Sequence, residues 1–245
     1  MSDQLLIYSL DACDTVLNEA RRLFACQRFP VGASVIAAAQ TAGRGQHGHA
    51  WSSPAGNLYA AIRLPLTAPF TDFRGPMTVS AVIADVLADF DFDVHIKWPN
   101  DLVISAPQKG FAKCAGILLE RKGELLAAGI GINLASAPSA AALREGAALP
   151  AGSLADLGVR TPSAPELWNA IARRFAAFDA EAFTKRWPAP VESRLLWQGK
   201  SVTLARDDAP PVTGVLTGLG PQGEALLLDA RSLQSFTEGS LRPAF

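Results

Sequence analysis

Residues 33–51 read ASVIAAAQTAGRGQHGHAW. The first seven of these residues are apolar or small and include two β-branched side chains, which predicts a buried strand. Three glycines then surround a single arginine, Arg44. Glycine lets the backbone approach a ligand closely, so successive N–H groups can converge on an anion while the guanidinium supplies a forked cation. The stretch therefore predicts a core strand that runs directly into an anion-binding loop.

The segments around this loop predict an α+β domain with a mixed central sheet and packed helices. A strand is expected at residues 4–9, followed by an amphipathic helix at 14–25 with Asp11 or Asp14 as its cap. The next strand is expected at residues 57–64. Further strands are expected at residues 94–98, 102–105, 113–120 and 125–134, with helices at 75–87 and 163–178.

The pattern changes in the last fifty residues or so to short strands separated by glycine, proline and aspartate. Strands are expected at residues 201–205, 212–219, 224–228 and 233–237. Such short, closely spaced strands predict a small barrel appended to the main domain. We therefore expect a larger domain at residues 1–190 and a small one at 191–245, with a weakly patterned loop at 135–151.

The overall composition is that of an ordinary globular protein. The 245 residues are 49% hydrophobic and 18% charged, with a net charge of −1, so nothing in the charge balance predicts a nucleic-acid partner. No apolar run reaches the roughly 20 residues that cross a bilayer, and no signal peptide is apparent, so we expect a cytoplasmic protein without a membrane partner. The three cysteines form no CxxC pair, and each is expected to be a small buried hydrophobe.

Three further clusters carry chemistry: KWPND at residues 97–101, KCAGIL at 113–118 and GIGIN at 129–133. Lys113 opens an apolar strand, where a buried ammonium needs a partner anion. Asp101 is a candidate for holding Mg²⁺ on a nucleotide, since carboxylate oxygens suit this ion. These clusters predict a site for a negatively charged ligand.

Ordinary phosphate motifs do not explain these clusters. A Walker A loop requires lysine and serine or threonine where His49 and Ala50 stand, and the GIGIN segment lacks the third glycine of a dinucleotide-binding turn. His47 and His49 have no third metal ligand beside them, which favours a loop role. From the residues alone, plain structural roles also stay open: a tight turn for the glycines, a solvent-directed ammonium for Lys113 and a turn cap for Asp101.

The clusters together resemble one family in order along nearly the whole chain: the biotin protein ligases, also called biotin–acetyl-CoA-carboxylase ligases. The matching segments are residues 40–51, 53–59, KWPNDL at 97–102, KCAGILLE at 113–120, GIGIN at 129–133 and EGSLR at 238–242. The resemblance implies a biotin ligase-like catalytic domain with a small SH3-like C-terminal domain and no N-terminal DNA-binding domain. It also implies a reaction in which biotin and ATP form biotinyl-AMP, after which biotin passes to a lysine of a biotin carboxyl carrier domain.

The resemblance also implies roles for individual residues. Lys113, Arg44 and Asp101 would be catalytic, with Asp101 near the Mg²⁺ that accompanies ATP. A homodimer is a further possibility. The residues expected to bind biotin or the adenylate are Thr15, Val16, Leu17, Gln40, Gly43, Arg44, Gly45, Gln46, Trp51, Lys97, Asn100, Lys113, Gly116, Gly131 and Asn133.

The sequence departs from the family pattern at two places. Thr15-Val16-Leu17 stands where the family has the Ser-Thr-Asn that binds the ureido ring of biotin, and Gln46 replaces the second arginine of the glycine loop. A site that hydrogen-bonds a ureido group discriminates strongly when its partners change. Two alternatives therefore stay open beside a biotin ligase: a weak or altered-specificity paralogue for another carboxylic acid, such as lipoate or octanoate, and a ligand-binding sensor. The retained Lys113, Asp101 and Arg44 favour an enzyme.

Overall fold

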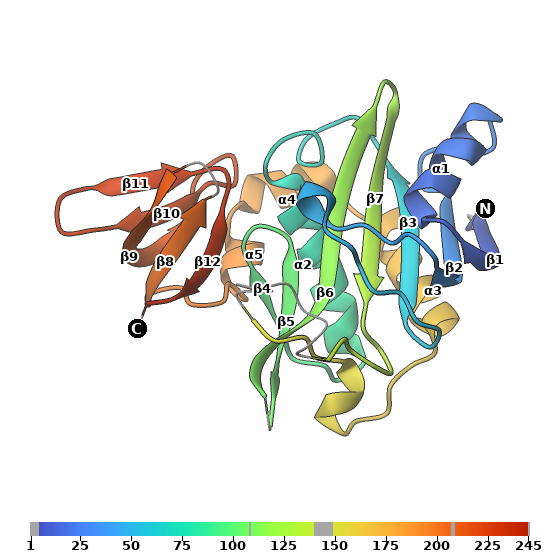
Figure 1. Ribbon diagram of the computed structural model, residues 1–245. Coiled ribbons are helices and arrows are strands. Elements are labelled where there is room, and N and C mark those ends of the chain that lie inside the picture. The colour runs from blue at the N-terminus through green and yellow to red at the C-terminus, as the bar shows by residue number, and fades with distance from the viewer. Residues whose placement is uncertain (1–4, 108, 140–148, 207–208, 245) are drawn as a thin grey trace.

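The structure, a computed structural model, describes residues 5–107, 109–139, 149–206 and 209–244. It contains a large sheet covered by helices and a smaller sheet beside it (Figure 1). The large sheet consists of β1 (Ile7–Cys13), β2 (Ser34–Gln40), β3 (Leu58–Leu64), β4 (Val94–Lys97), β5 (Asp101–Ala106), β6 (Gly110–Lys122) and β7 (Leu125–Ile132). The small sheet consists of β8 (Ser201–Arg206), β9 (Ala209–Leu219), β10 (Ala225–Leu228), β11 (Leu233–Phe236) and β12 (Ser240–Pro243).

The strand order of the large sheet is β1-β2-β3-β7-β6-β5-β4, and that of the small sheet is β11-β10-β9-β8-β12. Strands β1 and β2 are parallel, whereas the other neighbours in the large sheet are antiparallel. The large sheet is therefore mixed, and the α+β prediction with a small C-terminal β-domain is confirmed.

Helices cover both faces of the large sheet. Helix α1 (Val16–Ala25) packs its buried side chains on one face, against Tyr59 of β3 and Ala127 of β7. Helix α2 (Gly75–Asp89) and helix α3 (Ala164–Ala176) pack on the other face. Helix α2 packs on the sheet, on α3 beside it and on Gly223 of the small sheet, so most of its residues are apolar and buried.

The start of α1 differs from the prediction. Thr15 is the N-cap, and its side-chain oxygen accepts a hydrogen bond from the Asn18 backbone N–H at 3.0 Å. The expected caps Asp11 and Asp14 are wrong, because the helix begins at Val16, two residues later than expected, and the Asp14 carboxylate instead accepts from Asn18 Nδ2 and from Arg22. The first strand is also displaced, to Ile7–Cys13, and its predicted start at residue 4 lies outside the described residues.

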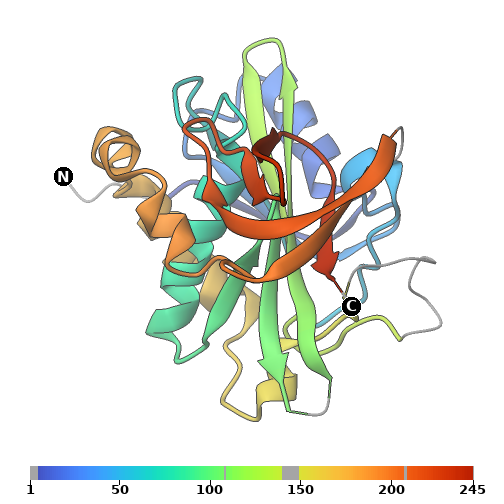
Figure 2. The same cartoon turned by 90° about the vertical axis from the view of Figure 1, so that its left-hand side faces the viewer.

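The small sheet is attached to the corner that joins β4 and β5. Trp98 Nε1 donates a hydrogen bond to the Gly223 carbonyl at 2.9 Å, and Trp187 Nε1 donates to the Gly220 carbonyl at 2.9 Å. Buried side chains of both sheets belong to one apolar cluster. Figure 2 shows the strands of the small sheet running across the direction of β6 and β7. The small sheet therefore has a fixed place beside the large one.

Short elements between the two sheets were not predicted. Helices α4 (Ala180–Arg186) and α5 (Ala189–Glu192) lead from α3 toward the small sheet. The last strand of the small sheet, β12, was not predicted either. The proposed domain boundary between residues 190 and 191 stays a prediction. Much of the weakly patterned segment at 135–151 lies outside the described residues, which resume at 149.

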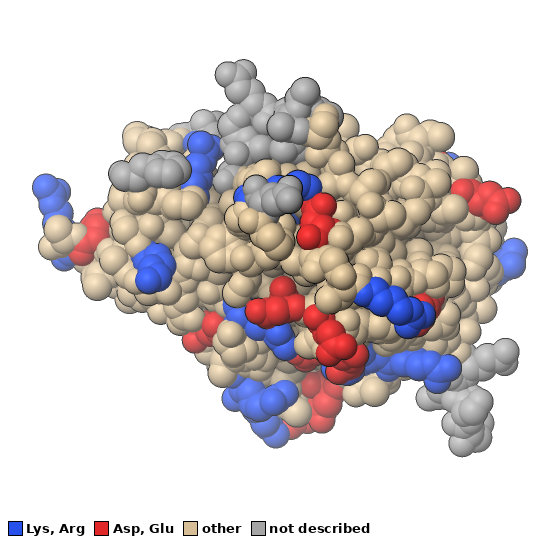
Figure 3. Space-filling view, turned by 90° about the horizontal axis from the view of Figure 1, so that it is seen from below, with Lys and Arg blue, Asp and Glu red and all other residues tan. Residues whose placement is uncertain are grey.

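The surface shows mixed charge. On the face in Figure 3, lysine and arginine lie close to aspartate and glutamate rather than in a patch of one sign. Of the helices in the described ranges, none is both long and apolar enough to cross a bilayer. The cysteines differ in environment: burial raises the pKa of the Cys114 thiol to about 12, whereas Cys26 is exposed, so the expectation that every cysteine is buried is wrong.

Candidate active site

A cavity of about 900 Å³ lies between the start of α1, the glycine loop after β2 and the strands β5, β6 and β7, and the small sheet forms part of its rim. We use "glycine loop" for residues 41–53. The structure brings every predicted site residue to the wall of this cavity, although their roles stay predictions. These residues are Thr15, Val16, Leu17, Gln40, Gly43, Arg44, Gly45, Gln46, Trp51, Lys97, Asn100, Asp101, Lys113, Gly116, Gly131 and Asn133.

Glycines make the floor of the cavity flat. Gly116 of β6 and Gly131 of β7 are paired across the sheet, and the indole of Trp51 lies on them. A Cβ atom at Gly131 would lie 2.6 Å from Trp51 Cε2, and one at Gly116 would lie 2.9 Å from Trp51 Cζ3. Gly129, two residues along the same face, leaves room for Leu17 in the same way, at 2.7 Å. The GIGIN and KCAG segments therefore serve close packing on the sheet.

The other end of the cavity is cationic. Asp101 Oδ1 lies 2.7 Å from Lys113 Nζ, and Asp101 Oδ2 lies 3.8 Å from Lys97 Nζ. Lys97 is only 4% exposed and Asp101 9%. Lys113 Nζ also lies 5.3 Å from the ring centroid of Trp51, within range of a cation–π interaction. Two ammonium groups share one carboxylate, so this end has a surplus positive charge that suits an anion.

The same geometry bears on the predicted magnesium site. Each Asp101 oxygen faces an ammonium group, and a cation there would compete with both lysines. Within the described ranges, no group of three or more histidine, cysteine, aspartate or glutamate residues is placed to hold a metal ion. These residues do not fit a magnesium site built by the protein.

Two asparagines lie beside the cationic end. Asn100 Nδ2 donates to the Ile117 carbonyl at 2.7 Å, and Asn133 Nδ2 donates to the Gly152 carbonyl at 3.0 Å. Asn133 is 2% exposed, and its Oδ1 has no hydrogen-bond partner among the described residues. An unpaired buried acceptor is costly, so Asn133 is suited to accept from a ligand that enters the cavity.

The end of the cavity at α1 is apolar. Val16 and Leu17 are buried there, and the nearby polar side chains are used within the protein. Gln40 Oε1 accepts from the Val16 backbone N–H at 2.9 Å, and Gln40 Nε2 donates to Ser53 Oγ at 2.9 Å. Gln40 therefore links the start of the helix, the end of β2 and the return of the glycine loop.

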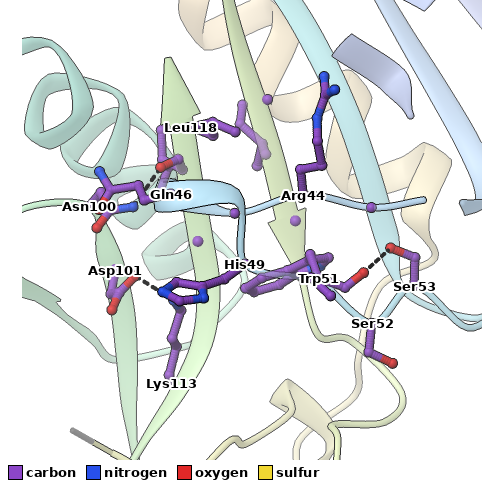
Figure 4. A pocket seen from close by; sticks show the side chains of 18 of the residues that line it. Arg44, Gln46, His49, Trp51, Ser52, Ser53, Asn100, Asp101, Lys113 and Leu118 are labelled. Carbon is purple, nitrogen blue, oxygen red and sulfur yellow. Dashed lines mark hydrogen bonds and ion pairs between the residues drawn. The ribbon is translucent and has the colours of Figure 1, made fainter. Parts of the chain in front are cut away.

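Arg44 and Lys113 are not brought together. The Arg44 Nη2 atom donates to Asn18 Oδ1 at 3.0 Å and lies 3.7 Å from Glu120 Oε1. In Figure 4 its guanidinium points away from Asp101 and Lys113. Its acceptors, Asn18 on α1 and Glu120 on β6, do not line the cavity. Gln46 begins a 3₁₀ turn, Gln46–Gly48, within the same loop.

The sequence analysis missed the contribution of the small sheet. Arg206, at the end of β8, lines the cavity together with Glu238, Gly239 and Ser240. The Arg206 guanidinium lies 5.2 Å from the ring centroid of Phe236, and its Nε is buried without a partner among the described residues. The EGSLR segment at 238–242 was a signal for this rim, but no local pattern marks Arg206.

Comparisons with known proteins agree with this geometry. Residues 19–135 match the biotin/lipoate A/B protein ligase family. The chain is 31% identical to a biotin–[acetyl-CoA-carboxylase] ligase of Paracoccus denitrificans, over 79% of this chain and 82% of that protein. It is 30% identical to the Mycobacterium tuberculosis protein of the same name, over 80% of this chain and 73% of the relative. The structure of a biotin protein ligase from Aquifex aeolicus in complex with biotin and ATP has the same fold, with a TM-score of 0.79 and 24% identity over 98% of this chain and 99% of that one.

Proposed function

Since the chain belongs to the biotin/lipoate A/B protein ligase family, we propose that it is a biotin protein ligase that joins biotin to ATP and passes the activated biotin to a protein. The observation that carries the proposal is the Lys113–Asp101–Lys97 cluster at the end of a flat, glycine-floored cavity. The acceptor is proposed to be a lysine of a biotin carboxyl carrier domain. A cytoplasmic location and a homodimer stay predictions.

The cluster suits the first step, in which a carboxylate attacks the α-phosphate of ATP. Both reactants are negative, and charge builds up on the pyrophosphate as it leaves. The ammonium groups of Lys113 and Lys97, already held by Asp101, would offset this charge without having to rearrange. Mg²⁺ is proposed to accompany ATP on its phosphate oxygens, since Asp101 is engaged by both lysines.

The second step needs only alignment and exclusion of water. The uncharged amine of the acceptor lysine attacks the acyl carbonyl, and AMP leaves with the electrons of the broken acyl–phosphate bond. No covalent enzyme nucleophile is required, because the mixed anhydride is already activated. Trp51 and the glycine loop would shield the anhydride from water.

An ATP–pyrophosphate exchange assay with biotin, lipoate and octanoate in parallel tests the proposal. Biotin is expected to support exchange. Val16 and Leu17 make the α1 end of the cavity apolar, which is the reason to compare biotin with lipoate and octanoate. Exchange with lipoate or octanoate but not with biotin would instead favour a ligase for another acid. If none of the three acids supports exchange, the sensor alternative gains and the proposed function is overturned.

We propose that the Arg206 guanidinium, at the rim of the cavity, contacts the β- or γ-phosphate of ATP. Its replacement by alanine is expected to raise the KM for ATP about tenfold or more while leaving the KM for biotin unchanged, because a charged contact to phosphate is worth about 1.5–3 kcal/mol. Steady-state exchange at varied ATP checks this. Transfer from synthetic biotinyl-AMP, which lacks the β- and γ-phosphates, should be unaffected.

The matched control is Arg231→Ala, which removes an exposed arginine from the connection between β10 and β11, outside the cavity lining. An equal rise in KM in this variant, or none in Arg206→Ala, would mean that Arg206 does not bind the nucleotide.

A further inference from the structure

We propose that Asn18, Arg21 and Glu120 position the glycine loop by holding Arg44, and that Arg21 keeps this hold reversible. We call these four residues the Arg44 latch. The proposal rests on the proposed function only for what the loop covers, which is the acyl-adenylate. The hold itself is a property of the protein without any ligand.

The Arg44 latch consists of two guanidinium groups that share two acceptors. Asn18 Oδ1 accepts from Arg44 Nη2 at 3.0 Å and from Arg21 Nη1 at 3.2 Å. Glu120 forms an ion pair with Arg21 and lies 3.7 Å from Arg44 Nη2. Three members stand on regular elements, α1 and β6, and only Arg44 stands on the loop.

The latch ties the tip of the glycine loop to α1 and β6, whereas Trp51 anchors the return of the loop on Gly116 and Gly131. The Gly45 N–H donates to the His49 carbonyl, and the Trp51 N–H donates to the Gly43 carbonyl, so these backbone bonds join the loop only to itself. The start of the loop is tied to β1 through the Thr41 N–H and the Cys13 carbonyl. Arg44 adds a tie from the tip to α1 and β6.

The shared acceptors make opening inexpensive. When Arg44 leaves, Arg21 still pairs with Glu120 and Asn18, so no carboxylate is left unpaired. The Arg44 and Glu120 side chains are 36% and 24% exposed, and ion pairs at such sites are weak and screened. Without Arg21, Arg44 would be the remaining cationic partner of Glu120 within the latch. Opening of the loop would then leave the Glu120 carboxylate without a cationic partner in the latch. Loss of Glu120 should therefore loosen the loop, whereas loss of Arg21 should tighten it.

Hydrogen exchange of residues 41–53 in the ligand-free protein tests these opposite effects. Glu120→Gln is expected to speed exchange of the loop amides about 2- to 5-fold, the factor that a partly exposed ion pair supplies, and Arg21→Ala is expected to slow it by a similar factor. The matched controls are Glu124→Gln and Arg121→Ala, which make the same charge changes at exposed positions near the β6–β7 turn. Amides of α3, which carries no residue of the latch, serve as the internal reference.

The lifetime of enzyme-bound acyl-adenylate supplies the functional readout. It should shorten in Glu120→Gln and lengthen in Arg21→Ala, with the KM for ATP unchanged in both, and Glu120→Asp should restore part of the lifetime. If both variants shift exchange in the same direction, or match their controls, the latch is wrong. If the wild-type protein forms no adenylate, the proposed function fails, and hydrogen exchange still decides the latch.

Discussion

Replacement of Lys113 by alanine is expected to reduce adenylate formation at least about 10²–10³-fold, the range that follows loss of one positioned electrostatic donor. Lys113 Nζ lies at the cationic end of the cavity, 2.7 Å from Asp101 and beside the ring of Trp51. Without it, Lys97 would be the one ammonium group of the cluster left to meet the charge that develops at the α-phosphate. ATP–pyrophosphate exchange with biotin measures the loss directly.

The control for this variant is Lys109→Ala. Lys109 lies just before β6 and pairs with Asp156 at 2.7 Å, outside the cavity. The Lys109→Ala substitution removes the same charge from the same region. It should leave the rate of ATP–pyrophosphate exchange within about twofold of wild type, as surface substitutions usually do. Thermal unfolding of both variants separates loss of chemistry from loss of fold. Exchange in a folded Lys113→Ala variant at the wild-type rate would refute the catalytic role.

The second large effect is expected from Gly131→Ala. The added Cβ would lie 2.6 Å from two atoms of the Trp51 indole. The backbone of β7 cannot shift to relieve this contact, because β7 is hydrogen-bonded to β3 on one side and β6 on the other. Such overpacking costs about 1–3 kcal/mol of folding stability. Displacement of the indole also misplaces the groups above the floor, and a shift of about 1 Å can cost about 100-fold in rate. Urea unfolding and the kcat/KM for biotin measure the two losses.

A second substitution distinguishes crowding from a general defect of β7. In the Trp51→Ala background, Gly131→Ala should lose little stability, because the atoms it meets are gone. Activity should stay low in the double variant, since the indole that covers the floor is absent. Equal destabilisation by Gly131→Ala in both backgrounds would show that Trp51 is not what requires glycine at this position.

The fold was predictable wherever the core demands long apolar segments. Strands β3 and β7 are buried almost throughout, β2 is buried in its first half, and all three appeared as apolar runs, while the capping box at Ser163 marked the start of α3. Helices α4 and α5 are short, with few buried side chains, and gave no comparable signal. The cap of α1 was misplaced because aspartate and threonine are both good caps, and the Asp14 carboxylate is instead engaged by the side chains of Asn18 and Arg22 on the same helix.

The candidate site was predictable as a set of residues but not as a set of contacts. The motifs named the residues that line the cavity. They did not show that Gln40 is engaged by the backbone of Val16 or that Arg44 faces Asn18. Partners such as Arg21 and Glu120 lie 99 positions apart in the chain, and a single sequence contains no local trace of a pairing at that distance. Arg206 was missed for the same reason.

The hydrogen bond from Trp98 to Gly223 makes the C-terminal barrel inseparable from the chemistry of the larger domain. Trp98 is 1% exposed and stands between Lys97 and Pro99, one step from the lysine that faces Asp101. Deletion of residues 191–245 would uncover this indole and release the corner that carries the cationic cluster. The C-terminal barrel thus supports the residues that hold the cationic cluster in place. An enzyme without the barrel is expected to lose the arrangement of Lys97 and Asp101 as well.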